Sequence, residues 1–145
     1  MDNEKRKTIL DFLHGHKLGV IATLNQEKGK PEAALVAFSE TDNCELIFGT
    51  FADTRKYTNL QKNPQVAFVI GLDDEEDITL QYEGAAREVF NGELKECQKI
   101  HVLKNPSSEK YAYDEKQRFF RVTPNWIRYS NLSSDLTVVF EIDRF

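Results

Sequence analysis

The sequence predicts a mainly β fold, an antiparallel barrel with helices inserted between some of its strands. Short apolar segments follow one another with polar turns between them, which is typical of an antiparallel sheet. The segments with helical spacing do not alternate regularly with these strands, as a doubly wound parallel sheet would require. The expected strands are residues 18–24, 31–39, 45–50, 66–72, 78–89, 118–129 and 136–142.

The length and composition are those of one domain. The chain has 145 residues, of which 40% are hydrophobic, enough to bury a sizeable core. No internal repeat, low-complexity tract or proline-rich linker divides it, so we expect a single domain over residues 1–145. The formal net charge of -5 gives no general attraction for nucleic acid or anionic lipid, and we expect neither as a partner.

The N-terminal segment predicts an amphipathic helix over residues 3–16, ended by Gly15 and packed across an open end of the barrel. Its apolar side consists of Ile9, Leu10, Phe12 and Leu13. The segment lacks a long apolar region followed by a small-residue cleavage site, and no stretch of the chain approaches a bilayer-spanning length. We therefore expect a cytoplasmic protein.

Glycine and proline positions refine the strands. Pro31 suits the start of a strand, where its missing NH group costs no ladder hydrogen bond. Gly84, inside the fifth strand, predicts a bulge or a close approach of other backbone. Pro124 is expected to interrupt the strand over residues 118–129.

Two further helices are expected. One begins at Ala52 or Asp53, where the Asp53 carboxylate can accept from free NH groups of the first turn, and stops at Asn63-Pro64. The other covers residues 92–104 and ends at Asn105-Pro106. Residues 107–116 look irregular.

The chain offers little for a metal ion. His14 and His16 form an HxH pair that could face a metal from a strand, but they lie at a helix end, where a surface role is favoured. Cys44 and Cys97 lie far apart without a CxxC pattern and are interpreted as small apolar residues. The acidic run at residues 73–77 lacks EF-hand spacing and is interpreted as a solvated hairpin loop. We therefore predict no metal site.

Only one segment of the sequence has the residue types of a ligand-binding site. The GxSxG, HExxH, GxGxxG and GxxxxGK[ST] patterns are all missing from the sequence. Thr54, Arg55 and Lys56, in the first turn of a helix, combine free NH groups, the positive end of the helix dipole, a hydroxyl group and two cations. Such a set suits a phosphate monoester, although a TRK triplet also arises by chance on surface helices.

A resemblance gives this triplet its context. The segments GVIATLNQEKGKPEAALVAF, ELIFGTFADTRKYTNLQKNPQVAFVI and YEGAAREV resemble the FMN-binding split-barrel superfamily related to pyridoxamine 5'-phosphate oxidase. The likeness covers residues 18–89, and RFFRVTPNWIRYSN resembles the family's final strands more loosely. It implies a six-stranded antiparallel split barrel that binds FMN and forms a homodimer with the flavin at the interface.

The resemblance also implies a phosphate site. Thr54, Arg55 and Lys56 match the Ser/Thr-Arg-Lys that holds the flavin phosphate in the family. Gly49 and Thr50 match the end of the strand beneath it. These five residues are therefore the expected phosphate end of a cofactor site.

The isoalloxazine ring is expected elsewhere. Ala34, Leu35 and Val36 match the strand whose backbone faces the ring edge, and Trp126 of the partner chain is expected to cover the ring. At Ala34 pyridoxamine phosphate oxidases carry an arginine, and at Ser39 a lysine that contacts the substrate phosphate. Oxidation of pyridoxamine phosphate is therefore not expected.

Other aromatic residues could wall a flavin or fill the barrel, and for each of them the core is favoured. They are Phe48, Phe51, Phe68, Phe119 and Phe120.

Two main functions follow from these observations. The first is an FMN-dependent oxidoreductase with a small-molecule redox partner, in which the flavin carries the redox chemistry and no catalytic side chain is assigned. The second is a non-catalytic carrier of a flavin, a deazaflavin or a tetrapyrrole, or a stress-related redox sensor. A structural dimer with an empty site is a third. A haem-related role would need a histidine near the pocket, and nothing in the sequence places His101 there.

Overall fold

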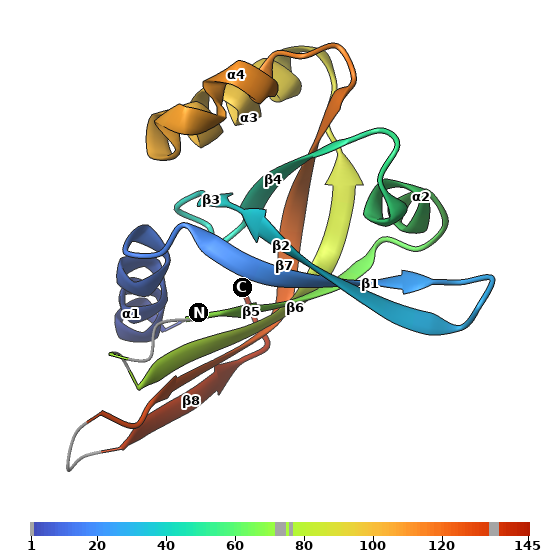
Figure 1. The fold of residues 1–145 in the computed structure, drawn as a ribbon. Coiled ribbons are helices and arrows are strands. Elements are labelled where there is room, and N and C mark those ends of the chain that lie inside the picture. Colours follow the sequence, from blue (N-terminus) through green and yellow to red (C-terminus); the bar gives the residue numbers. More distant parts are fainter. Residues whose placement is uncertain (1, 72–74, 76, 134–136) are drawn as a thin grey trace.

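The computed structural model describes residues 2–71, 75, 77–133 and 137–145, and within them eight strands form one curled antiparallel sheet (Figure 1). The strand order is β2-β1-β5-β6-β7-β4-β3, and β8 pairs with β7. The strands are β1 (Leu18–Asn25), β2 (Lys30–Ala37), β3 (Ser39–Glu40), β4 (Leu46–Phe51), β5 (Gln65–Ile70), β6 (Ile78–Glu88), β7 (Gln117–Asn131) and β8 (Val138–Ile142). The prediction of a mainly β, antiparallel fold is confirmed.

The described residues form eight strands, whereas the apolar segments predicted seven and the resemblance implied six; the strand beyond seven arises because the chain divides at Phe38. Ala37 pairs with Leu18 of β1, whereas Ser39 pairs with Ile47 of β4, at the other end of the sheet. One predicted strand therefore becomes β2 and β3, which are consecutive in the chain and lie at opposite ends of the strand order. This crossing curls the sheet into a half-open barrel.

The predicted last strand began at residue 136, which lies outside the described residues, as do positions 73, 74 and 76 of the acidic run.

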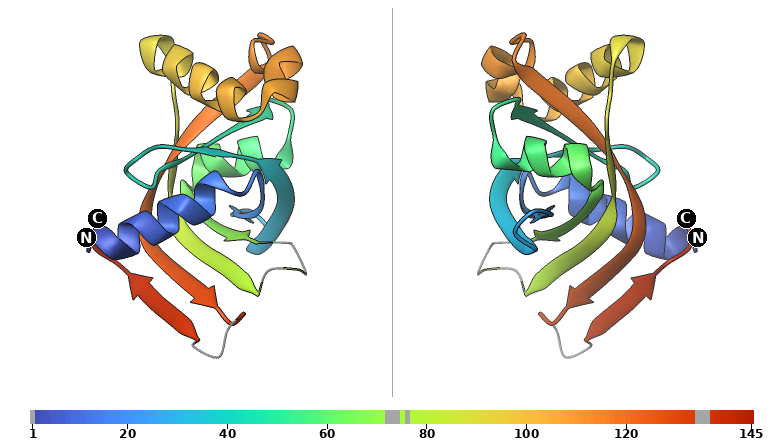
Figure 2. Two further views of the ribbon diagram at one scale, coloured as in Figure 1. Left: turned by 90° about the vertical axis from the view of Figure 1, so that its left-hand side faces the viewer. Right: turned by 90° about the vertical axis from the view of Figure 1, so that its right-hand side faces the viewer.

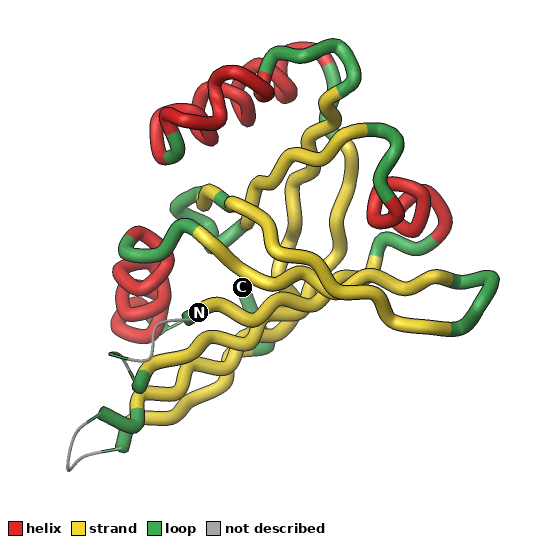
Figure 3. Tube along the Cα trace, in the orientation of Figure 1, coloured by secondary structure: helices red, strands yellow, loops and turns green. Residues whose placement is uncertain are grey.

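Helices lie at the periphery of the sheet (Figures 2 and 3). They are α1 (Asn3–His14), α2 (Arg55–Lys62), α3 (Asn91–Lys104), the 3-10 turn η1 (Pro106–Ser108) and α4 (Glu109–Ala112). The short helical turns after α3 correct the expectation that residues 107–116 are irregular. None of the described helices is long and apolar enough to cross a membrane.

The barrel interior is filled by aromatic rings, as expected for most of the phenylalanines. Phe48 stacks on Phe120 with ring centroids 5.3 Å apart, and Phe68 meets both Phe48 and Tyr82 edge to face. The hydroxyl group of Tyr82 donates to the carbonyl oxygen of Cys44 at 2.8 Å, so this buried polar group has a partner. Phe119 belongs to a second cluster under α3, and Phe51 is only partly buried.

Both cysteines are buried. Cys44 lies in the main core and Cys97 in the cluster under α3. Burial raises the pKa of the Cys97 thiol to about 11, so the thiol is protonated and unreactive at neutral pH. Their interpretation as small apolar residues is confirmed.

The predicted irregularity at Gly84 is present. The register of β6 against β7 shifts between Glu83 and Gly84, so that Gly84 lies opposite Pro124 and Asn125 has no partner in β6. A Cβ atom on Gly84 would lie 2.4 Å from the carbonyl oxygen of Thr123, so only glycine fits. Pro124 sits at this bulge, and β7 continues through it, contrary to the expected interruption.

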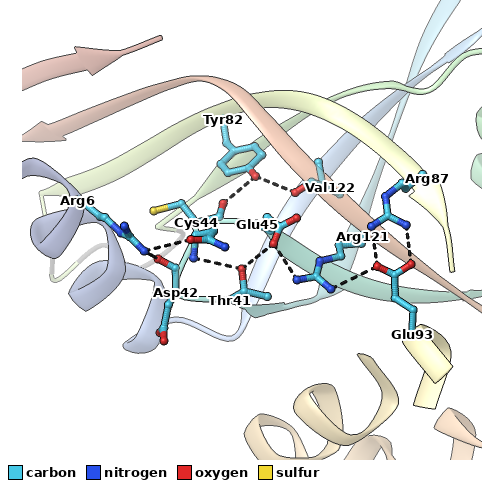
Figure 4. Close-up of polar contacts among 11 residues, drawn as sticks. Arg6, Thr41, Asp42, Cys44, Glu45, Tyr82, Arg87, Glu93, Arg121 and Val122 are labelled. Atoms are coloured by element: carbon cyan, nitrogen blue, oxygen red, sulfur yellow. Dashed lines mark hydrogen bonds and ion pairs between the residues drawn. The ribbon is translucent and has the colours of Figure 1, made fainter. Parts of the chain in front are cut away.

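A chain of ion pairs holds α3 over the sheet (Figure 4). Arg121 of β7 contacts Glu45 at 2.9 Å and Glu93 of α3 at 3.4 Å. Glu93 also pairs with Arg87 of β6 at 2.6 Å. Arg121 is largely buried, so its two carboxylate partners offset the cost of removing its charge from water. Helix α3 is thereby fixed above the end of the barrel that carries the candidate site.

Candidate functional site

Two adjoining cavities lie where β2 passes the start of α2. The larger, of about 280 Å³, lies between β2, the end of β4 and the helices α3 and α4, and is called the large cavity. The smaller, of about 210 Å³, lies between β1, β2 and the start of α2, and is called the small cavity. Thr54 and Lys56 line both, so the beginning of α2 joins the two spaces.

Eight of the nine predicted cofactor residues line these cavities. The large cavity receives Leu35, Val36, Gly49, Thr50, Thr54 and Lys56. The small cavity receives Ala34, Arg55 and again Thr54 and Lys56. Trp126 of the same chain lies elsewhere, in a groove with Val20 and Val69. Its expected role was in the partner chain, and that role stays a prediction.

The first turn of α2 is set by Thr54. Its hydroxyl oxygen accepts from the NH group of Tyr57 at 3.3 Å, which makes Thr54 the N-cap in place of the predicted Asp53. Asp53 is exposed and precedes the cap. The Thr54 hydroxyl also lies 2.8 Å from that of Thr50, which ties the end of β4 to the helix. The NH groups at the first two helical positions keep no intrahelical acceptor.

Lys56 is a cation without a partner in the site. Its side chain is half-buried, and burial lowers the pKa of its ammonium group. Among the described residues, no carboxylate or other acceptor is bonded to this group. A desolvated, unpaired ammonium group favours the binding of an anion.

Arg55 already has an anionic partner. Its guanidinium group lies 3.1 Å from Oε2 of Glu32, and Oε1 of Glu32 accepts from Asn59 at 2.9 Å. Sequence reasoning missed Glu32, although residues at every second position of a strand face the same way, and Glu32 precedes Ala34 by two. The small cavity therefore contains a carboxylate beside its two cations.

Gln117 is a second residue that sequence reasoning missed. It lines the large cavity, and its Oε1 atom is buried without a hydrogen-bond donor among the described residues. Its amide packs against Gly49, where an added Cβ atom would lie 2.4 Å from Nε2. A buried acceptor without a protein donor is compatible with a ligand that brings a hydrogen-bond donor to this wall of the cavity. No local sequence signal marks Gln117, because its role depends on the pairing of β4 with β7.

Helix α3 brings His101 to the large cavity, although nothing in the sequence placed it there. Its Nδ1 atom lies 3.1 Å from the hydroxyl oxygen of Ser39, and only 4% of the residue is exposed. Burial, together with the nearby Lys104, lowers the pKa of His101 to about 4. The imidazole is therefore neutral at physiological pH, and Ser39 is covered by α3.

The other histidines have separate partners. Nδ1 of His14 lies 2.6 Å from a Glu40 carboxylate oxygen, and Nδ1 of His16 lies 2.7 Å from the carbonyl oxygen of Phe12. Within the described ranges, no three histidine, cysteine or acidic residues gather closely enough to hold a metal ion.

The chain is similar to known proteins over most of its length. A family model described as pyridoxamine 5'-phosphate oxidase matches residues 6–131. General stress protein 26 of Bacillus subtilis (strain 168) is 31% identical over 93 residues, which are 63% of this chain and 64% of that protein. The match thus spans slightly less than two thirds of that relative.

Solved structures share the fold. General Stress Protein 26 from Bacillus anthracis str. Sterne has a TM-score of 0.72 at 23% identity, over 87% of this chain and 93% of that chain. A heme binding protein from Mycobacterium smegmatis has a TM-score of 0.76 at 17% identity, over 94% of this chain and 56% of that chain. At these identities the likeness establishes the fold alone.

Proposed function

Because the chain belongs to the pyridoxamine 5'-phosphate oxidase family, we propose that it binds FMN and acts as a flavin-dependent oxidoreductase. The observation that carries the proposal is the unpaired, half-buried ammonium group of Lys56 beside the Thr54 cap. The FMN phosphate would lie at the start of α2, and the ring would lie along β2.

The residues present fit the phosphate end of this cofactor. Lys56 supplies a compact cation, Arg55 a planar guanidinium group, and the first turn of α2 two free NH groups. The hydroxyl groups of Thr50 and Thr54 complete a rim of polar atoms. This set matches a phosphate dianion better than a carboxylate, which has fewer oxygens to satisfy.

The residues also fit the ring end. β2 has a hydrogen-bonded neighbour, β1, on one side only, so every second backbone NH and C=O group of residues 34–36 is unpaired in the sheet. Leu35 is 59% exposed beside these groups, and Gln117, whose Oε1 atom has no donor among the described residues, lines the same cavity as Leu35. A flat heterocycle with apolar faces and polar edges would satisfy both the unpaired backbone groups of β2 and the acceptor of Gln117.

Bound FMN would supply hydride or electron transfer, and the chain would bind the ring, orient it and exclude water. The neutral His101 adds no charge to the large cavity. Ala34 and the buried Ser39 provide no cation for a substrate phosphate. The proposed substrate is therefore a small molecule other than pyridoxamine phosphate.

A homodimer is part of this proposal. Leu18 and Val69 are 48% and 43% exposed, which leaves apolar surface on β1 and β5. The groove that contains Trp126 lies beside Val69. Sedimentation of the purified protein should give a dimer at micromolar concentration, and a stable monomer that retains FMN would contradict it.

The second candidate is a non-catalytic tetrapyrrole carrier. It is favoured by the position of His101 on the large cavity and by the heme binding protein among the structural neighbours. It is disfavoured because His101 is buried and its Nδ1 atom contacts Ser39. Binding of haemin, with no binding of FMN, would establish the carrier instead.

FMN titration tests the first proposal. Flavin fluorescence should be quenched on binding, and FMN should raise the melting temperature, because it binds the folded state. Lys56→Met should weaken binding at least tenfold, whereas Lys62→Met, at the exposed end of the same helix, should not. Bleaching of the bound flavin by NADH or NADPH without oxygen would then separate an enzyme from a carrier.

A further inference from the structure

Glu32 is an unexpected residue in a phosphate site. Its carboxylate lies in the small cavity with Arg55, Lys56 and Thr54, the residues proposed to hold the phosphate. One oxygen contacts the guanidinium group of Arg55 at 3.1 Å. A fixed negative charge at this place opposes the entry of another anion.

The carboxylate is held in place by neutral donors. Oε1 accepts from Nδ2 of Asn59 at 2.9 Å, and Asn59, which is 5% exposed, also donates to Thr23 at 2.9 Å. Oε2 has a longer contact with Asn25 at 3.4 Å. These bonds, led by that of Asn59, lower the pKa of Glu32, so the group is ionised at neutral pH. Glu32 thus remains in the cavity whether or not Arg55 stays beside it.

Arg55 is free to change partners. Its side chain is 73% exposed, whereas that of Glu32 is 14% exposed. An ion pair with one solvated partner contributes little to stability, so its exchange for a contact with a ligand costs little. Without ligand, Glu32 engages Arg55 and leaves Lys56 as the unpaired cation of the site.

We propose that Glu32 is an internal competitor that shares Arg55 with the ligand phosphate and keeps FMN binding readily reversible. The cavity has two cations and one fixed carboxylate, so a phosphate dianion brings the local charge from +1 to -1. Without the carboxylate the same dianion would be neutralised. The inference rests on the proposed phosphate site and concerns its affinity.

Glu32→Gln tests the competition. The substitution keeps an acceptor for Asn59 and removes the charge, and FMN affinity should rise about tenfold at low salt, as expected for one charge near a dianion in a solvated site. Glu27→Gln is the matched control, because Glu27 lies in the turn of the same hairpin, 79% exposed and paired with Lys62. Unchanged or weaker FMN binding by Glu32→Gln would overturn the proposal.

A double-mutant cycle tests the role of Arg55. If Glu32 acts by holding Arg55, Glu32→Gln should improve binding much less in the Arg55→Ala background. Equal gains in both backgrounds would overturn competition for Arg55. If Glu32→Gln folds poorly, Glu32→Ala serves instead, since Asn59 keeps its bond to Thr23.

Inorganic phosphate separates this inference from the FMN proposal. Millimolar phosphate should raise the melting temperature of Glu32→Gln more than that of the unchanged protein. If FMN fails to bind but this difference appears, the cofactor proposal fails and the competition stands. If FMN binds, but FMN and phosphate each act on Glu32→Gln as they do on the unchanged protein, the competition fails and the cofactor proposal stands.

Discussion

The hydroxyl oxygens of Thr50 and Thr54 lie 2.8 Å apart and join the end of β4 to the first turn of α2. Thr54 donates its hydroxyl hydrogen to the carbonyl oxygen of Phe51 at 3.0 Å, so in this pair Thr50 is the donor. The position of the helix start, and of Lys56 within it, therefore depends on two short side chains.

Thr54→Ala should weaken both the fold and the site. The substitution removes the cap of α2, which costs about 1 kcal/mol of unfolding free energy. It also releases Thr50, so FMN affinity should fall. Thr54→Ser keeps the hydroxyl group and should behave almost as the unchanged protein in urea denaturation and FMN titration. Equal losses in the two variants would show that the methyl group, rather than the hydroxyl, matters.

Gln117→Leu should separate stability from binding. The free protein buries Oε1 of Gln117 without a donor, at a cost of about 1 to 3 kcal/mol. A leucine removes that acceptor, so the unfolding free energy should stay constant or rise. FMN affinity should fall two- to tenfold, the value of about one hydrogen bond. Lower stability with unchanged FMN affinity would assign Gln117 a structural role only.

His101 should make stability depend on pH. Its folded pKa of about 4 lies below the ordinary 6.5, so the unfolded chain takes up a proton first as pH falls. The contribution of neutral His101 to the unfolding free energy is fully present above pH 6.5. It falls by about 3 kcal/mol as the pH is lowered to 4. The pKa of Glu93 is lowered from 4.5, so its stabilising contribution is present above pH 4.5 and is lost only below that pH. His101→Gln should flatten the decline between pH 6.5 and 4.5, and an unaltered slope in urea titrations would contradict the assignment.

Gly84→Ala should destabilise the sheet strongly. The new Cβ atom would lie 2.4 Å from the backbone oxygen of Thr123, and backbone cannot move aside as a side chain can. We expect a loss of about 3 kcal/mol in unfolding free energy. Gly92→Ala in α3 is the control: no atom lies within 4 Å of its Cβ position, and alanine should be neutral or stabilise the helix by up to about 1 kcal/mol. Similar melting temperatures for the two variants would contradict this reading.

Local patterns predicted much of the fold. The alternation of apolar residues indicated most strands to within a few residues, and Gly84 was correctly expected at an irregularity. The capping residue was wrong by one position, because Asp53 and Thr54 both suit an N-cap and only the conformation of the loop selects between them. Thr54, Arg55 and Lys56, which are proposed to hold a phosphate, could be singled out in the sequence because they are adjacent in the chain.

The sequence by itself determined the antiparallel strands, the three longest helices and the cations at the start of α2, since each depends on neighbours a few residues away. Only the tertiary structure decided what faces those cations. Glu32 reaches Arg55 from β2, Gln117 meets Gly49 through the pairing of β7 with β4, and α3 carries His101 over Ser39. These contacts join residues 23 to 68 positions apart, and their geometry arises from the curl of one sheet, which no local pattern specifies.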